Sequence, residues 1–239
     1  MASSAALAAV ALPAAAAPQN DSDLSTRETR AVVHAYAKCV VAKAPRKAAE
    51  AIQRNVDNRT MLKEYPVLMN PDCLETGPRV AMEARFTGDL YRYALADALV
   101  VRDLAAFTGN DFSAVPKLEY RLQADAPAAV DSKGRPLNKK KYEAAVAAYE
   151  RNRVVAYVAL YGECVARTAP AETQALLLTK PDSPEESLRF KALAPALGGC
   201  LASGETLRFG KVTLRGTLAM NYYRLATAAR VAGTRTVGS

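Results

Sequence analysis

Several residue types on which catalytic sites depend are scarce in this 239-residue chain. It contains no tryptophan and one histidine, His34. A Ser-His-Asp or Cys-His enzyme would therefore need His34 as its base. The sequence also contains no G-x-S-x-G motif, glycine-rich phosphate loop, H-E-x-x-H motif or EF-hand loop. A hydrolase or other enzyme built from dispersed carboxylate, Tyr or Arg side chains leaves no linear pattern, so it stays an alternative.

Long apolar runs are also missing, and no stretch reaches the roughly 18 residues that a membrane span needs. The apolar run nearest the start, AALAAVAL at 5–12, precedes small residues that fit the A-x-A cleavage rule near Ala16. We predict a signal peptide over 1–16 and a periplasmic or secreted protein. The basic region that normally precedes such a run is missing, since the first cation is Arg27. The alternative is a disordered, alanine-rich tail.

The balance of residue types favours helices and a basic surface. Half of the residues are hydrophobic, and alanine, the best helix former, is abundant, so we expect an all-α fold. The net charge of +8 attracts anionic partners in a salt-dependent way. No nucleic-acid-binding module is recognisable, and export would remove that partner, so we expect no nucleic acid. The alternative is a soluble basic protein without a charged partner.

Three blocks of sequence occur twice in the same order. Y-x-x-C-V-x-x-x-A-P begins at Tyr36 and again at Tyr161. CLETG at 73–77 matches CLASG at 200–204, and LYRxxLA at 90–96 matches TLRxxLA at 213–219. The period of roughly 125 residues is too long for a solenoid repeat. We interpret it as a tandem duplication of a roughly four-helix unit.

The predicted boundaries follow from this interpretation and from helix start signals. They are helical repeat 1 over 24–106, a linker over 107–138, helical repeat 2 over 139–231 and a tail over 232–239. The predicted starts are Ser25, Asn138, Pro170 and Ser183. The fourth helix of each repeat is expected at about 89–106 and 212–231. Short extended segments are possible at 80–86, 118–122 and 206–209, where apolar and polar residues alternate.

The four cysteines are placed symmetrically, two in each predicted repeat. Four cysteines allow three pairings, and duplication favours the self-contained one, Cys39–Cys73 with Cys164–Cys200. The alternative is four free thiols in a cytosolic protein. We expect no metal or other cofactor, because there is no C-x-x-C motif. We interpret His34 as a helix-surface or partly buried residue rather than a ligand or base.

Two sets of cations are candidates for anion binding. Arg92 and Arg215 occupy the same place in the two predicted repeats and could present guanidinium groups to an anion. We favour a structural role for both, bridging to carboxylates or helix-end carbonyls within each repeat. The second set lies at the end of the predicted linker and consists of Lys133, Arg135, Lys139, Lys140 and Lys141. It is either a solvated helix start or an anion-docking patch.

The stretch from ECVARTAP to LRGTLAMNYYRLA, over about 164–225, carries a Cys-Val, Pro, Leu-Ala-Pro-x-Leu-x-x-Cys-Leu, Leu-x-Phe and Leu-Arg-Gly-x-Leu-Ala pattern. In this it resembles uncharacterised exported proteins of alphaproteobacteria. The first predicted repeat matches more loosely, with Tyr91-Arg92-Tyr93 in place of Leu-Arg-Gly. The resemblance implies export and a helical fold. It implies no activity, so it assigns no functional residue.

The favoured functional hypothesis is an exported, non-catalytic scaffold or binding protein of the periplasm or cell surface. Its partner would be an anionic envelope component or another exported protein. The alternatives are the dispersed-site enzyme and a basic protein that binds anionic envelope polymers. A concave pocket with convergent polar groups and shifted pKa values would favour an enzyme over a scaffold.

Overall fold

The computed structural model describes residues 22–74, 89–120, 125–201 and 210–236. These residues are mainly helical, which confirms the all-α class. The extended pairing found among them is an isolated bridge between Val130 and Pro136. The predicted signal peptide and the candidate extended segments at 80–86 and 206–209 lie outside the described residues. The described part of 118–122 has no regular secondary structure.

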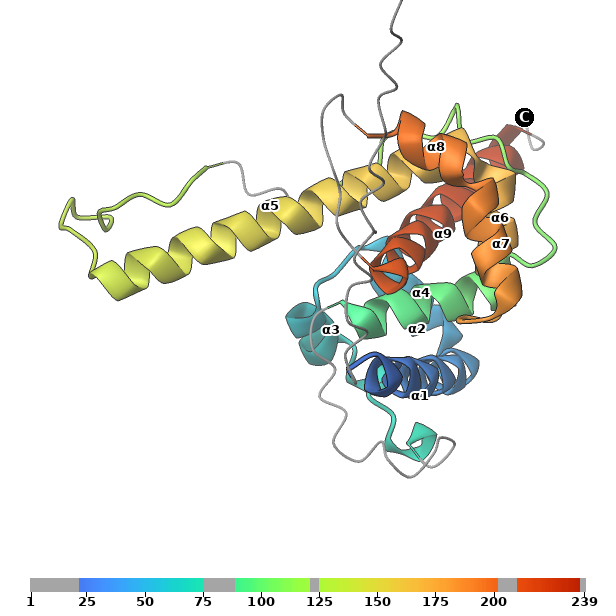
Figure 1. Cartoon of the computed structure of the whole chain (residues 1–239), viewed down its shortest axis with the longest axis horizontal. Helices are drawn as coiled ribbons and strands as arrows, with labels where there is room; N and C mark the ends of the chain where they lie inside the picture. The colour runs from blue at the N-terminus through green and yellow to red at the C-terminus, as the bar shows by residue number, and fades with distance from the viewer. Residues whose placement is uncertain (1–21, 75–88, 121–124, 202–209, 237–239) are drawn as a thin grey trace, which may run out of the picture.

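The helices fall into a first half, up to α4, and a second half, from α5 onward. The first half contains α1 (Ser22–Lys43), α2 (Pro45–Gln53), α3 (Asn58–Glu64), the 3-10 helices η1 (Pro66–Leu68) and η2 (Pro71–Cys73), and α4 (Leu90–Asp103). The second half contains α5 (Lys139–Thr168), α6 (Pro170–Leu177), α7 (Pro184–Ala192), α8 (Ala194–Gly199) and α9 (Lys211–Thr236). Figure 1 shows their arrangement.

Three of the four predicted helix starts are confirmed. The Asn138 side chain accepts a hydrogen bond from the Lys140 backbone N–H at 2.9 Å, and the Ser183 hydroxyl accepts one from Glu186 at 3.2 Å. Pro170 is the first residue of α6, where its missing N–H does no harm. The prediction for Ser25 is wrong, because α1 begins at Ser22 and places Ser25 inside the helix.

The sequence predicts a third helix in each repeat that ends just before the second cysteine. This helix is broken in both halves, and prolines explain the breaks. In the second half α7 ends at Ala192, and Pro195 lies in the first turn of α8. A proline inside a continuous helix would lose a hydrogen bond and clash with the preceding turn. In the first half Pro66 and Pro71 start η1 and η2 in the same way. The last helix, α9, continues to Thr236, so most of the predicted tail is helical.

The centre of the fold is the contact between α4 and α9. Helices α1 and α2 pack on α4, and α5 and α6 pack on α9. The buried apolar residues form one cluster that includes side chains from both halves. Gly216 allows α9 to approach α4 closely, because a Cβ atom at this position would overlap the ring of Tyr93.

Both predicted disulfides are confirmed. Cys39–Cys73 joins α1 to η2, and Cys164–Cys200 joins α5 to the residue after α8. The Cα atoms are 5.6 and 5.8 Å apart, and the bonds close loops of 34 and 36 residues. Each half therefore carries one covalent link between its first helix and the segment before its last helix.

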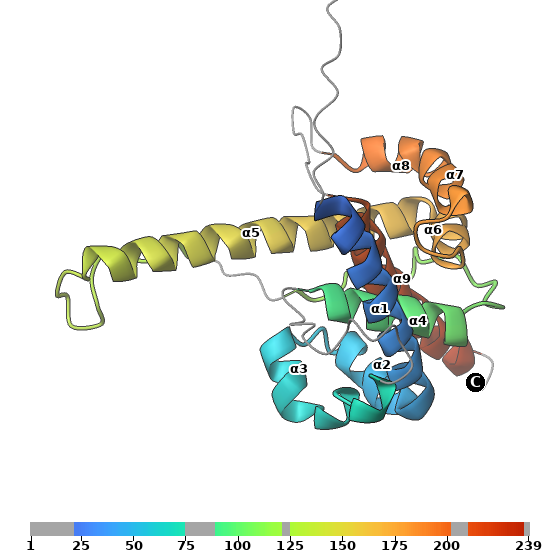
Figure 2. The same cartoon turned by 60° about the horizontal axis from the view of Figure 1, so that its bottom comes forward.

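Helix α5 extends well beyond the body of the molecule (Figures 1 and 2). Its 30 residues correspond to about 45 Å. The first buried residue along it is Val158, and those before it are exposed or half-buried. We call residues 139–157 the arm. None of the helices in the described ranges has an apolar stretch long enough to cross a membrane.

The first part of the predicted linker packs into the body, which the sequence did not indicate. Arg167 on α5 donates to the carbonyl oxygens of Phe112 and Pro116, each at 2.7 Å. Gln174 on α6 donates to the carbonyls of Leu104 and Phe107, each at 2.8 Å. These two side chains fasten the segment that follows α4 to the second half, and Phe112 is buried there.

Candidate functional site: a cationic pocket between α1, α4 and residues 178–184

A cavity of about 810 Å³ lies between α1, α4 and the segment that connects α6 to α7. This volume is within the range of about 300–1,000 Å³ that is usual for small-molecule sites. One face of α1 lines it, through Arg27, Ala31, His34, Ala35 and Lys38. Their spacing of three or four residues places them on the same side of the helix.

Part of the cavity wall is apolar. Val101 of α4 and Leu178 expose 42% and 40% of their surface, which is high for residues inside a hollow. Ala31 and Ala35 of α1 and Pro181 of the connecting segment also line the cavity. A ligand with an apolar body would remove this surface from water.

The rim is cationic. Arg27, Lys38 and Lys180 line the cavity and are exposed. Within the described residues none of the three forms an ion pair. Arg30 is different, because its guanidinium lies 3.0 Å from the Asp182 carboxylate. The rim therefore presents three positive charges that no ion pair within the described ranges compensates.

Asp97, which lines the cavity, belongs to a buried charge network. The Arg215 guanidinium lies 2.9 Å from the Asp97 carboxylate and 3.1 Å from that of Glu186. The exposed fractions of these side chains are between 4% and 7%. Removing one member of a buried ion pair leaves an uncompensated charge, so this network is important for stability.

Arg215 is not available to an external anion. Besides the two carboxylates, its guanidinium donates to the carbonyl oxygens of Leu176, Leu177 and Thr179 at 2.9–3.1 Å. It therefore holds the C-terminal end of α6, which agrees with the structural role that we favoured. One detail of that prediction is wrong: Asp97 belongs to the first half, so the ion pair joins the two halves instead of staying within one.

His34 lies beside this network and faces the cavity. Its Nδ1 atom is 3.5 Å from the Asp97 carboxylate. Burial, and then the positive charge of Arg215, lower the pKa of His34 to about 4, so the imidazole is neutral near pH 7. Burial raises the pKa of Asp97 to about 6, although Arg215 acts in the opposite direction. The partly buried position of His34 agrees with its predicted environment.

The hydroxyl groups in this cavity serve the backbone. Thr179 donates to the carbonyl oxygen of Leu176 at 2.6 Å, and the Ser183 hydroxyl caps α7. Neither hydroxyl contacts His34, as a serine- or threonine-type nucleophile would contact its base. The arrangement suits binding better than nucleophilic catalysis.

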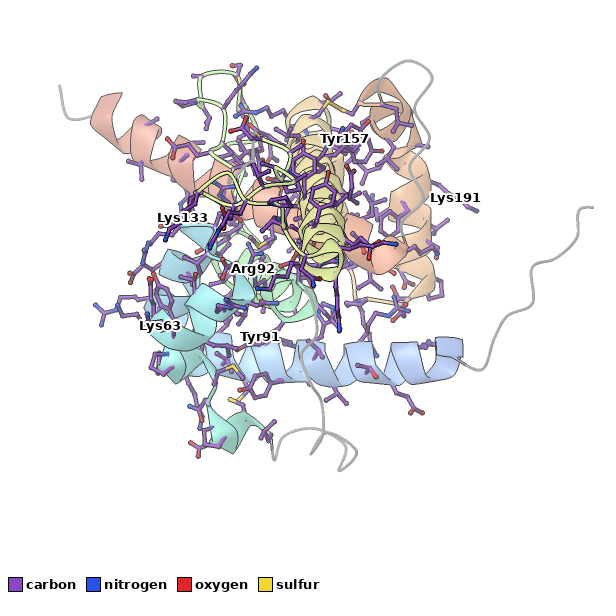
Figure 3. All side chains as sticks on the ribbon, turned by 90° about the vertical axis from the view of Figure 1, so that its left-hand side faces the viewer. Lys63, Tyr91, Arg92, Lys133, Tyr157 and Lys191 are labelled. Atoms are coloured by element: carbon purple, nitrogen blue, oxygen red, sulfur yellow. A yellow bond between two sulfur atoms is a disulfide. The ribbon has the colours of Figure 1, made fainter. Side chains whose placement is uncertain are left out.

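The other predicted anion-binding cations lie far from this cavity. Lys133, Arg135, Lys139, Lys140 and Lys141 are all exposed and lie together at the free end of the arm. Figure 3 views the molecule from that end. Arg135 pairs with Asp131 at 2.7 Å, and Lys139 lies 3.9 Å from Glu143.

Arg92 lies in the first turn of α4 and is labelled in Figure 3. Its guanidinium donates to Asp89 at 2.6 Å and to the Asn55 side chain at 2.8 Å. It therefore reaches the residue just beyond the end of α2. Arg92 also lines a second, smaller cavity.

The sequence held only part of the signal for the main cavity. The spacing of Arg27, His34 and Lys38 could have indicated one cationic face of α1. The contribution of residues 178–184 depends on how α6 and α7 pack against the first half, which has no local pattern. The repeated residues Tyr36 and Tyr161 are both buried, and Tyr161 donates to the carbonyl of Leu197 at 2.9 Å.

No group of three or more His, Cys, Asp or Glu side chains in the described ranges is placed to hold a metal ion. No protein-family model matches the chain, and comparison with curated proteins and with solved structures gives no match either.

Proposed function

We propose that this is an exported, non-catalytic binding protein that holds a small amphipathic anion between α1, α4 and residues 178–184. One observation carries the proposal: the same cavity combines exposed apolar side chains with three cations that have no ion-pair partner in the described residues. Apolar walls with a few placed polar groups are typical of ligand pockets.

The charges around the cavity favour an acidic headgroup. The internal network of Arg215, Asp97 and Glu186 carries one excess negative charge, and the rim of Arg27, Lys38 and Lys180 adds three positive ones. Arg30 and Asp182 cancel each other. A carboxylate, phosphate or sulfonate would therefore lie at the rim, with its apolar part against Val101 and Leu178.

The proposal is testable with 8-anilinonaphthalene-1-sulfonate, a fluorescent probe that joins a sulfonate to aromatic rings. We expect saturable binding to the oxidised protein and competition by decanoate. Replacing Lys38 and Lys180 together by Glu should weaken binding at least about tenfold, because two attractive charges become repulsive.

The matched control is Lys191→Glu. Lys191 is an exposed lysine of α7 that does not line the cavity and lies at the edge of the molecule (Figure 3). It should leave probe binding unchanged. Equal weakening by Lys191→Glu and the double variant would indicate a general charge effect and contradict the proposal. Failure of decanoate to displace the probe would also contradict it.

Export is part of this proposal. The two disulfides support it, because structural disulfides persist mainly in oxidising compartments. Non-reducing peptide mass spectrometry of the protein from its native host provides the test. We expect a mature N-terminus at Ala17 and the links 39–73 and 164–200. An intact Met1 with four free thiols would contradict export.

We also propose that the two halves arose by duplication. Both halves have a disulfide at the same place and a first and second helix packed on the last one. In both, an arginine near the start of the last helix reaches the end of the second helix, through Asn55 for Arg92 and Leu177 for Arg215.

A second candidate function, binding of an anionic envelope polymer, is favoured by the cations at the free end of the arm. Replacing Lys139, Lys140 and Lys141 by Gln should reduce retention on heparin, used as a model polyanion, and make it less salt-dependent. Unchanged retention would contradict this candidate. Probe binding in the main cavity should not change.

A further inference from the structure

A second cavity, of about 270 Å³, lies on the opposite side of α4, between α4, α5 and α9. It is close to the lower limit of about 300 Å³ for ligand sites. Unlike the main cavity, it is lined by two buried guanidinium groups, Arg92 and Arg224. Asn152 and Asn221 also line it.

Arg224 is a buried cation that forms no ion pair within the described residues. It exposes 7% of its surface. Within the described residues its guanidinium donates one hydrogen bond, to the carbonyl oxygen of Glu119 at 2.8 Å, and lies over the Tyr120 ring at 5.3 Å. Its Nε and Nη1 atoms donate none there. Burial lowers the pKa of Arg224, although Tyr120 and Glu163 act in the opposite direction.

The nearby carboxylate, Glu163, is already paired. Arg167 holds it at 2.7 Å, and the Tyr120 hydroxyl lies 2.8 Å from its other oxygen. On the opposite wall, Arg92 neutralises Asp89 at 2.6 Å. The remaining acid that lines the cavity, Asp57, accepts a hydrogen bond from the Thr60 N–H at 2.7 Å as the N-cap of α3.

Arg92 adds a second unused donor. Its Nε atom is buried and has no hydrogen-bond partner among the described residues. The exposed fraction of Arg92 is 8%. Buried donors without partners are costly, and a buried guanidinium without a counter-ion is more so. An anion in the cavity beside Arg224 would compensate the charge of its guanidinium.

We propose that this cavity binds one small oxoanion, a phosphate or carboxylate group, between Arg92 and Arg224. A planar fork of N–H donors matches carboxylate and phosphate oxygens, which is why arginine is suited to such groups. Asn152, Asn221 and Tyr120 also line this cavity. The site is separate from the main cavity and does not depend on the function proposed for it.

The test uses the oxidised full chain and three probes: inorganic phosphate, sulfate and acetate, titrated by calorimetry and by their effect on the melting temperature. Sodium chloride at matched ionic strength is the reference. We expect at least one probe to bind and to raise the melting temperature beyond the chloride reference. The ratio of phosphate to acetate affinity distinguishes a tetrahedral ligand group from a planar one.

Arg224→Gln should weaken binding of that probe at least about tenfold, because charge-assisted hydrogen bonds are lost. The matched control is Arg230→Gln on the same helix, an exposed arginine that donates to the Asp103 carbonyl at 3.2 Å. Its affinity should equal that of the unmodified protein. Lys38→Glu with Lys180→Glu should also leave this binding unchanged, which separates the two sites.

A cavity-filling variant keeps the test valid if Arg224→Gln folds poorly. Ala156 of α5 lines the cavity, and Ala156→Leu should block it without removing either arginine. Loss of probe binding with a normal melting temperature in chloride would support the site. The proposal is overturned if no probe binds at high millimolar concentration, or if Arg224→Gln and Ala156→Leu both bind as tightly as the unmodified protein.

Discussion

Arg92 and Arg215 occupy the same place in the two halves of the molecule, but their surroundings differ. Arg215 bonds to two carboxylates and to backbone carbonyls from α6 and the residues that follow it. Arg92 bonds to one carboxylate and one amide, and its Nε atom has no hydrogen-bond partner in the described part of the chain. The first arrangement saturates a buried guanidinium, whereas the second leaves donor capacity next to a cavity.

The tyrosines show the same divergence. In the second half Tyr161 of the first helix donates to the Leu197 carbonyl, just before the second cysteine of the disulfide. In the first half a carbonyl from the same region, that of Leu68, accepts instead from Tyr91 of the last helix. The two halves therefore keep a similar scaffold while their polar connections differ, and the predictions below test where this similarity ends.

The largest expected difference comes from replacing each arginine by Met. Arg215→Met should reduce the free energy of unfolding by about 3–5 kcal/mol, because Asp97 and Glu186 remain buried without a cation. Arg92→Met should cost about 1 kcal/mol, since its ion pair is single and less buried. Urea unfolding of the oxidised variants measures both. Equal losses would show that the two sites are energetically equivalent.

The disulfides should behave alike. Replacing both cysteines of either bond by Ser should cost about 4 kcal/mol on the chain-entropy estimate, because the loops of 34 and 36 residues are nearly equal. The comparison uses thermal or urea unfolding of the two double variants. A large difference between them would mean that the packing around one bond changes when it is removed.

The halves differ in one group that titrates in weak acid. His34 has no counterpart in the second half, where Ala159 occupies the matching position. The pKa of His34 is about 4 in the folded state and 6.5 for the unperturbed side chain. The unfolded chain therefore binds more protons in this window, and His34 destabilises the fold as pH decreases from 6.5 to 4. As the pH falls from 7 to 4, the free energy of unfolding of His34→Gln should therefore rise by about 3 kcal/mol relative to that of the unmodified protein.

Titration of Asp97 changes stability in the opposite direction to titration of His34. The His34→Gln variant is therefore needed to isolate the effect of His34. Its raised pKa, about 6, stabilises the fold fully below its unfolded pKa of 3.8, and this contribution is lost as pH rises through 6. In the unmodified protein the two effects largely cancel. Guanidinium unfolding at a series of pH values measures the difference. A pH-independent difference between variant and parent would contradict the assignment.

The smallest expected effect concerns the contact between the halves. Gly216→Ala forces a Cβ atom against the Tyr93 ring and should cost about 1–3 kcal/mol through overpacking. Gly198→Ala in α8 is the control, since nothing lies within 4 Å of its added Cβ and alanine favours helix more than glycine. It should be neutral or stabilising. The melting temperatures of the two variants provide the measurement.

The sequence predicted the class, the disulfides and three of the four helix starts, because these depend on local signals such as caps, prolines and cysteine spacing. It did not predict that Asp97 would pair with Arg215, since the two are 118 residues apart and meet only when α4 packs on α9. Both cavities depend on the same packing. No repeated or local pattern in the sequence distinguishes Arg224. It becomes a candidate only because the fold buries it beside the second cavity.

The length of the arm has an electrostatic consequence. About 19 residues separate its first lysine, Lys139, from Val158, the first buried residue of α5, which corresponds to about 29 Å. The Debye length is about 8 Å at physiological ionic strength and about 30 Å at 0.01 M. In physiological salt the cationic tip and the body are therefore screened from each other, whereas in dilute buffer their fields overlap.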